Sequence, residues 1–189
     1  VDGVTVTLLG RDGKTPITPN ENGTYTLGYG VYTYTLSKNG YVVTRGSFSL
    51  GSADAANVKD GVLTVKTAVL PKVGENAWDG KTKTEPKKDG NGVYLIGTAA
   101  ELAWFAATDG KSSAKLTADI ELAGYDWTPL KKFYGTFDGQ GHVIRNLYIN
   151  STSNTLGLIS YLQGGASVTG LGITGSVTCT NNTRIAQAG

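Results

Sequence analysis

Acidic and basic side chains of the kind that cleave polysaccharides occur in the second half of the chain. The acidic groups that we expect to lie near one another are Asp119, Glu121, Asp126 and Asp138. A polysaccharide lyase needs clustered carboxylates for Ca²⁺ and an Arg or Lys base, and a glycoside hydrolase needs two carboxyl groups about 5–9 Å apart. Asp119 and Glu121 share one face of a predicted strand, and Arg145 could serve as the base. These residues form the starting set for a catalytic site.

A structural role explains the same residues with fewer assumptions. In the sequence Asp-Gly-Gln-Gly-His at 138–142, Asp138 can hydrogen-bond the backbone of its own turn, while Gly139 and Gly141 permit left-handed dihedrals. Alternation along the predicted strand already places its two acidic residues on the solvent side. We therefore expect turn and strand roles for these positions and no catalytic residue in this chain.

The inventory of metal ligands is short. His142 is the only histidine and Cys179 the only cysteine. A metal site built on His142 would need carboxylate ligands, because no second histidine and no nearby cysteine is present. The single cysteine excludes an intrachain disulfide, so packing and ladder hydrogen bonds must stabilise the fold. We expect no metal site and no cofactor.

Aromatic residues suggest a different activity, since exposed rings spaced along a wall of strands can stack on sugar rings. The aromatic group is Tyr125, Trp127, Phe133, Tyr134 and Tyr148. Packing is the alternative, with Trp127 and Phe133 filling the space between a helical cap and the first coil. The candidate carbohydrate-binding residues are Tyr125, Trp127 and Tyr134, of which the two tyrosines are the expected exposed members.

An internal repeat predicts the elements that position these residues. Residues 135–149 resemble residues 159–173 at an offset of 24 without a gap. The matched pairs are Phe137 with Tyr161, Gly141 with Gly165, Ile144 with Val168, Leu147 with Leu171, and Ile149 with Ile173. Leu122 precedes Leu147 by 25 residues, so near-equivalent leucines should stack in three successive turns. A fixed period of this size indicates stacked repeat units and assigns Gly165 to a repeat turn.

One helix and one wall strand precede the repeat. Thr98 and Glu101 form a capping-box pattern at the start of a helix predicted over 98–109, with Gly110 as its stop. This helix would cover the apolar end of the first coil. Alternation over 114–122 predicts the first wall strand, with its apolar residues on one face.

The first 72 residues read as short alternating strands separated by Asn-Gly and Asp-Gly turns. Predicted strands include 4–8, 24–27, 32–36, 41–50 and 62–69. Residues 73–92 are rich in Gly, Pro and Lys and predict a linker and a loop leading into the next domain. Trp78, too large an apolar group to leave in a loop, should pack on that next domain.

Each of the two main parts of the chain resembles a known protein family. The order of capping helix, wall strand, Gly-Thr-Phe-Asp-Gly-Gln-Gly at 135–141 and Leu-Gly-Ile-Thr-Gly-Ser-Val at 171–177 resembles the pectate-lyase-like right-handed parallel β-helix of bacterial surface proteins that carry GLUG repeats. The pattern at 23–41, Gly-x-Tyr-x-Leu followed by Gly-x-Tyr and Gly-Tyr, resembles carboxypeptidase regulatory-like and transthyretin-like modules.

The resemblances imply an all-β chain in three parts. Residues 1–72 would form a small Ig-like or carboxypeptidase regulatory-like β-sandwich, and residues 73–92 the linker and lead-in loop. Residues 93–189 would form the helical cap and first coils of a right-handed parallel β-helix, truncated where the next repeat motif should begin. An exposed coil end offers unpaired strand edges, which favours end-to-end self-association.

Composition limits the partners. The formal net charge is +2 without a dense basic run, which argues against nucleic acid, and no apolar run is long enough to insert in a membrane. We therefore expect a non-enzymatic, adhesin-like or spacer segment of a secreted or cell-surface bacterial protein, with surface glycans or proteins as partners. The alternative is a carbohydrate-binding or polysaccharide-cleaving β-helix whose active coils lie beyond residue 189.

Overall fold

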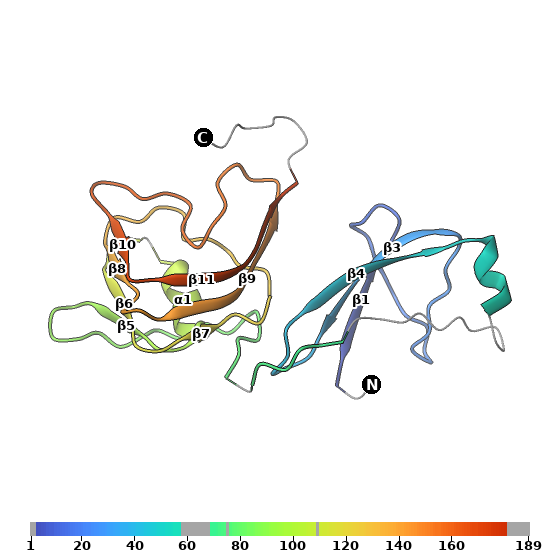
Figure 1. Cartoon of the computed structure of the whole chain (residues 1–189), viewed down its shortest axis with the longest axis horizontal. Helices are drawn as coiled ribbons and strands as arrows, with labels where there is room; N and C mark the ends of the chain where they lie inside the picture. Colours follow the sequence, from blue (N-terminus) through green and yellow to red (C-terminus); the bar gives the residue numbers. More distant parts are fainter. Residues whose placement is uncertain (1–2, 58–68, 75, 109, 181–189) are drawn as a thin grey trace. The chain divides into compact units, whose positions relative to one another are not determined.

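The computed structural model describes residues 3–57, 69–74, 76–108 and 110–180, and it divides into two compact units. Unit 1 is Val1–Lys72 and unit 2 is Val73–Gly189. The described residues are mostly β-structure with one α-helix, so the expectation of an all-β chain is confirmed at this level. Figure 1 shows the elements of both units.

Unit 1 contains one four-stranded antiparallel sheet among its described residues, in the order β2-β1-β3-β4. Its strands are β1 (Thr5–Leu9), β2 (Pro16–Ile17), β3 (Gly30–Ser37) and β4 (Thr44–Leu50). A short 3-10 helix, η1 (Ser52–Asn57), follows β4. A sandwich requires a second layer, and the described part of unit 1 supplies a single sheet.

The core of unit 1 uses one face of this sheet. Tyr32 and Leu36 on β3 are 4% and 5% exposed, and Leu8 on β1 is equally buried. The ring of Tyr32 stacks on Phe48 with centroids 5.6 Å apart. Val6 is 46% exposed, so the predicted inward alternation of the first strand holds only at Leu8.

One further strand prediction for unit 1 is wrong, and another falls outside the described residues. Residues 24–27 form no strand; instead Thr24 closes the Asn-Gly turn through hydrogen bonds to Asn20 and Asn22. Competition from these side chains for the backbone explains the missing strand. The predicted strand at 62–69 lies almost wholly outside the described residues.

Unit 2 is built from parallel strands in two sheets, each labelled in Figure 1. The first sheet has the order β10-β8-β6-β5, with β5 (Tyr94–Ile96), β6 (Ala114–Leu116), β8 (Thr136–Asp138) and β10 (Ser167–Thr169). The second has the order β11-β9-β7, with β7 (Ile120–Glu121), β9 (Val143–Ser151) and β11 (Gly172–Cys179). A third line of parallel bridges joins Leu130 to Ile159 and Phe133 to Leu162.

The chain passes from the first sheet to the second three times, at β6–β7, β8–β9 and β10–β11. The single wall strand predicted over 114–122 is therefore wrong: β6 and β7 belong to different sheets, with a bend at 117–118 between them. The predicted alternation holds on either side of the bend, because Leu116, Ile120 and Leu122 are all at most 1% exposed, whereas Ala118 at the bend is only partly buried. Burial, more than sheet membership, determines the pattern.

Helix α1 (Ala99–Ala106) packs against this core and confirms the predicted capping box. Thr98 Oγ1 accepts from the Glu101 N–H at 3.2 Å, and Glu101 Oε2 accepts from the Thr98 N–H at 2.9 Å. The helix ends at Ala106, earlier than predicted. Phe105 of this helix is 1% exposed, and its ring meets Phe133 edge-on and Phe137 at a tilt, each with centroids 6.1 Å apart.

The spacing of stacked residues differs from the sequence repeat. Ile120 pairs with Ile144, 24 residues later, although the expected stacking of Leu122 on Leu147 implied 25. Ile144 pairs with Ile173 and Phe137 with Val168, 29 and 31 residues later, where the repeat predicted 24. The predicted stacking of Leu147 on Leu171 is wrong, because Leu147 lies in register with Gly175. Asp126 bridges to Tyr148 and Leu130 to Ile159, so the chain from Tyr148 to Ile159 is longer than the stretch from Asp126 to Leu130 that it pairs with, and this extra length moves the register of the later strands.

The segment leading into unit 2 packs closely on it. Trp78 is 7% exposed, and its ring meets Trp127 edge-on at 5.8 Å, so its predicted packing on the second domain is confirmed. The Trp78 N–H donates to the Glu121 carbonyl at 3.0 Å, and the Leu95 N–H donates to the Lys87 carbonyl at 2.8 Å. Residues 78–88 thus supply backbone partners to β7 and β5.

Candidate functional site

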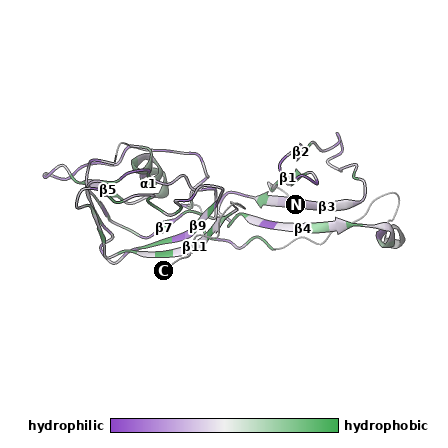
Figure 2. Cartoon of the chain, turned by 90° about the horizontal axis from the view of Figure 1, so that it is seen from above, coloured by the Kyte–Doolittle hydropathy of each residue, from purple (hydrophilic) through white to green (hydrophobic). Residues whose placement is uncertain are grey.

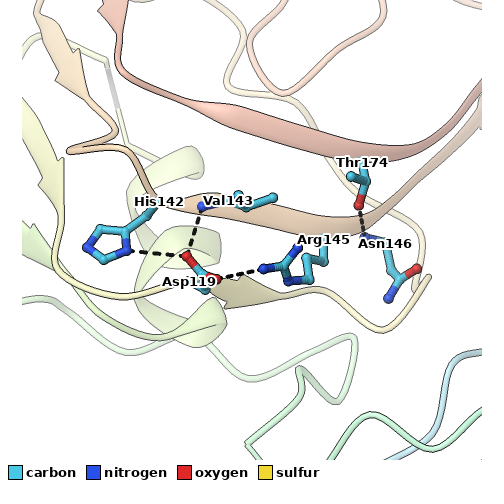
Figure 3. Close-up of polar contacts among 6 residues, drawn as sticks. All are labelled: Asp119, His142, Val143, Arg145, Asn146 and Thr174. Carbon is cyan, nitrogen blue, oxygen red and sulfur yellow. Dashed lines mark hydrogen bonds and ion pairs between the residues drawn. The ribbon is translucent and has the colours of Figure 1, made fainter.

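Asp119 is the centre of the most connected polar cluster in unit 2 (Figure 3). It lies at the bend before β7, and its carboxylate faces the start of β9. Oδ1 accepts from the Val143 N–H at 3.0 Å and lies 3.3 Å from His142 Nδ1, while Oδ2 accepts from Arg145 Nη2 at 2.7 Å. One carboxylate therefore contacts three residues at the start of β9, which are His142, Val143 and Arg145.

The environment of Asp119 favours its ionised form. The hydrogen bond from the Val143 N–H is the largest influence that lowers the pKa of this carboxyl below 3.8, and Arg145 and His142 lower the pKa further. A general acid needs the opposite shift, toward the working pH. Asp119 is thus arranged as a carboxylate that is ionised at neutral pH and joins strands.

Glu121 has a separate role on the same strand pair. Its Oε1 accepts from the Ala123 N–H at 2.7 Å and from Asn146 Nδ2 at 2.9 Å. Ala123 and Asn146 both have positive φ, 53° and 55°, and the glutamate bonds one at its backbone and the other at its side chain. Since a left-handed non-glycine residue costs energy, these bonds help to stabilise two adjacent corners.

The glycine-rich turn at 138–142 makes the turn contacts that its residue types predicted. Asp138 Oδ1 accepts from the Gln140 N–H at 2.9 Å. Gly141 has φ 81°, and its N–H donates to the Gly170 carbonyl at 2.7 Å. A side chain on Gly139 would meet the Gly170 carbonyl oxygen at 2.5 Å. The turn is thus shaped for close contact with the next chain segment.

Gly165 does not occupy the position equivalent to Gly141. It has φ 84° and lies in a turn closed by the Ala166 N–H donating to the Gln163 carbonyl at 3.0 Å. The segment that stacks on the Gly141 turn contains Gly170 instead. Gly165 therefore keeps its predicted turn role, whereas its predicted equivalence to Gly141 is wrong.

The four acidic residues named from the sequence do not converge on one point. Asp119, Glu121 and Asp138 each bond different backbone groups, and Asp126 forms a parallel bridge with Tyr148. Within the described residues, no three His, Cys, Asp or Glu side chains are grouped closely enough to hold a metal ion. None of the described helices has the length and apolar character to cross a membrane.

The aromatic candidates separate by burial. Trp127 is 5% exposed and its indole N–H donates to the Leu158 carbonyl at 3.3 Å, so its proposed place on a sugar-binding surface is wrong. Tyr125 is half-buried and meets Trp78 edge-on at 6.4 Å. Tyr134 is 44% exposed and remains open to a ligand.

Sequence reasoning missed one exposed ring beside Tyr134. Tyr161 is 48% exposed, and its carbonyl accepts from the Phe133 N–H at 2.9 Å, which places Tyr161 on the segment adjacent to Tyr134. The parallel bridge between Phe133 and Leu162 fixes this adjacency. The repeat matched Tyr161 with buried Phe137, and the true register would have identified it as an outward residue.

A small apolar pocket lies between α1 and the neighbouring chain segments. Leu102 and Phe105 of α1 line it together with Trp127 and Leu130. Its lining residues carry no charge, and the indole N–H of Trp127 already donates to the Leu158 carbonyl, so the lining offers none of the polar groups that orient a substrate in most small-molecule sites. The pocket is therefore a packing gap under the helix.

The polar groups of unit 2 thus act mainly between successive strands. Comparison of the chain with protein-family models, curated proteins and solved structures finds no significant match. Function must consequently be argued from the arrangement of side chains in this chain.

Proposed function

We propose that unit 2 is the capped beginning of a right-handed parallel β-helix of the kind found in bacterial surface proteins with GLUG repeats, and that unit 1 belongs to a carboxypeptidase regulatory-like β-sandwich. Three lines of parallel pairing support the first assignment, because a coiled chain with three walls would produce them. A helix packed at the first strand is what a solenoid end needs. For unit 1, the support is the antiparallel sheet together with the Gly-x-Tyr pattern.

The function that we infer is non-enzymatic: a spacer or display segment of a secreted or cell-surface bacterial protein. The observation that carries this proposal is the use of Asp119, whose carboxylate binds a backbone N–H, an arginine and a histidine of the next strand. A residue committed to three partners of one strand edge serves stability, and Glu121 and Asp138 follow the same principle.

Polysaccharide cleavage tests this proposal directly. The whole chain is incubated with acidic and neutral polysaccharides, with and without Ca²⁺, and unsaturated products and new reducing ends are measured. We expect neither product above the rate of a denatured control. Cleavage that disappears in Asp119→Asn but persists in Asp12→Asn, a substitution in unit 1, would assign catalysis to the cluster and overturn the proposal.

Carbohydrate binding is a second candidate, favoured by the two exposed tyrosines Tyr134 and Tyr161 on adjacent segments. Tyrosine offers a flat apolar face with a polar tip, which suits sugar rings. Glycan-array binding by the chain should fall on Tyr134→Ala and on Tyr161→Ala. Tyr29→Ala is the matched control, since Tyr29 is 63% exposed in unit 1. Equal loss in all three variants, or binding unaffected by either unit 2 change, excludes this surface.

A further inference from the structure

Asn-Gly pairs occur three times in the chain, at 22–23, 39–40 and 91–92, and each pair lies in a turn of the described residues. Asparagine is a chemically labile residue. It is most labile before glycine, because glycine has no Cβ to shield its backbone nitrogen from the neighbouring carboxamide. The three turns hold their pairs differently, and this difference predicts which asparagine is converted.

In two of the turns the glycine makes the closing hydrogen bond. The Gly23 N–H donates to the Asn20 carbonyl at 2.9 Å, and the Gly92 N–H donates to the Asp89 carbonyl at 3.0 Å. In both turns glycine is the fourth residue, whose N–H bonds the carbonyl of the first. An attack of either nitrogen on the preceding carboxamide must therefore break the bond that closes the turn.

The carboxamide of Asn22 is restrained as well. Its Oδ1 accepts from the Thr24 hydroxyl at 2.6 Å and from the Thr24 N–H at 3.2 Å. The side chain of Asn91 has no such bond to a described residue, so only its glycine nitrogen is held. These contacts predict that Asn22 reacts more slowly than Asn91.

The turn at 38–41 places its pair one position earlier. Asn39 is the second residue and Gly40 the third, and the Tyr41 N–H closes the turn by donating to the Lys38 carbonyl at 3.1 Å. Among the described residues, neither the Gly40 N–H nor the Asn39 side chain has a hydrogen-bond partner. Gly40 is buried, whereas Asn39 is exposed, so water reaches the carboxamide. Both reacting groups are free of hydrogen bonds in this pair.

We propose that Asn39 is a site of spontaneous deamidation, with water as the co-reactant. The Gly40 nitrogen gives its proton to hydroxide and attacks Asn39 Cγ. A bond forms between this nitrogen and Cγ, and the bond from Cγ to Nδ2 breaks with release of ammonia. Water then opens the five-membered succinimide. Opening at Cγ leaves aspartate, and opening at the main-chain carbonyl leaves isoaspartate.

The conversion changes the connection between two strands of unit 1. The turn joins β3 to β4, which lie side by side in the sheet (Figure 2). Isoaspartate routes the backbone through the former side chain and lengthens it by one methylene, and either product adds a carboxylate next to Lys38. The bond from the Tyr41 N–H to the Lys38 carbonyl spans the altered residue. Isoaspartate therefore disrupts the geometry that closes this turn.

The test compares the three pairs within one sample of the whole chain. The protein is incubated in mildly alkaline buffer, and peptide mapping by mass spectrometry measures the loss of each carboxamide over time. We expect Asn39 to convert about fivefold faster than Asn91 and about tenfold faster than Asn22, because each hydrogen bond that must break adds to the barrier. The product at position 39 should include isoaspartate.

The same incubation in urea separates turn geometry from local sequence. The unfolded chain keeps its Asn-Gly pairs but loses its turns, so the three rates should converge. Asn39→Gln is the matched control, since it keeps a carboxamide but moves it one carbon further from the Gly40 nitrogen. This variant should lose the conversion at position 39 and leave those at Asn22 and Asn91 unchanged.

Three outcomes overturn the proposal. One is equal or faster loss at Asn22 or Asn91 in the folded chain. Another is an order of rates that persists in urea, because local sequence and not the turn would then set it. The third is a folded chain that keeps Asn39 intact over a period in which the unfolded chain converts completely.

Discussion

The Asp119 carboxylate and the Arg145 guanidinium join neighbouring strands through a bond of 2.7 Å between Oδ2 and Nη2. Both side chains are about half exposed, so this ion pair alone contributes little to stability. The other carboxylate oxygen of Asp119, Oδ1, accepts a hydrogen bond from the Val143 N–H at 3.0 Å. The carboxylate therefore acts more as a backbone cap than as a salt bridge.

This distinction predicts the order of two substitutions. Asp119→Ala removes the contacts to Val143, His142 and Arg145 and should lower the denaturation midpoint of unit 2 more than Arg145→Ala, which removes one of them. Asp119→Asn should fall between wild type and Asp119→Ala, because the amide oxygen can still accept from Val143. Urea titrations followed by tryptophan fluorescence report on unit 2, which contains all three tryptophans. A larger loss in Arg145→Ala would contradict the capping role.

The Asp119 carboxylate predicts that the stability of unit 2 falls at acidic pH. Because the folded-state pKa of Asp119 is lowered below 3.8, its contribution is fully present above that ordinary value. The contribution is lost as pH falls through the lowered pKa. Asp119→Asn should flatten the stability curve in this acidic range and leave the curve at neutral pH nearly parallel to wild type. An unchanged acid limb would assign the pH dependence to other carboxyls.

The pKa of Asp12 in unit 1 can be measured directly. The Thr15 hydroxyl and the N–H groups of Thr15 and Lys14 donate to this carboxylate and lower its pKa to about 2. The Thr15 side chain is the largest cause, so Thr15→Val should raise the Asp12 pKa toward 3.8. Carboxyl ¹³C NMR titration measures it. Thr26→Val serves as the control, and a shift equal in both variants would contradict the assignment.

The sequence predicted the core of unit 2 better than its strand register. Alternation identified the buried residues Leu116, Ile120 and Leu122, and the capping box identified the start of α1. Both signals are local, since they depend on residues only a few positions apart. Register depends instead on the length of the segment between strands, which carries no regular pattern.

The chain between Tyr148 and Ile159 shows why the 24-residue repeat gives the wrong strand register. Asp126 bridges to Tyr148 and Leu130 bridges to Ile159, so four residues in one layer correspond to eleven in the next. The Gly-Gly pair at 164–165 resembles the earlier turn in composition and attracts the alignment to the wrong place. The same alignment error affected the prediction of the candidate sugar-binding surface. It matched Tyr161, which is exposed, with Phe137, which is buried.

Gly139 predicts a steric test of the glycine-rich turn. A methyl group there would meet the Gly170 carbonyl oxygen at 2.5 Å and Leu171 Cα at 2.6 Å, and both are backbone atoms that cannot rotate away. Gly139→Ala should therefore cost roughly 1–3 kcal/mol. Gly90→Ala is the matched control, since a methyl group at Gly90 meets nothing within 4 Å. Comparable unfolding free energies for the two variants would contradict the close packing.

Neighbouring aromatic residues at 133 and 134 test the inward and outward assignment. Phe133 is completely buried against Phe105, while Tyr134 is 44% exposed. Phe133→Ala should destabilise unit 2 by about 3–5 kcal/mol through the lost transfer energy and the cavity. Tyr134→Ala should stay within about 0.5 kcal/mol of wild type. A reversed order would mean that the register with Leu162 and Tyr161 is wrong.

The N-terminus of α1 offers the final prediction. Thr98 caps the Glu101 N–H through a hydroxyl that is exposed and has no packing role, so its contribution is the hydrogen bond itself. Thr98→Ala should cost about 1 kcal/mol, and Thr98→Ser, which keeps the hydroxyl, should cost much less. Because the helix buries its own side chains Leu102 and Phe105 in the core, the loss should appear in the cooperative unfolding of unit 2 rather than in local fraying. Amide exchange of α1 distinguishes the two, and faster exchange confined to the first turn would show that the cap does not stabilise the core.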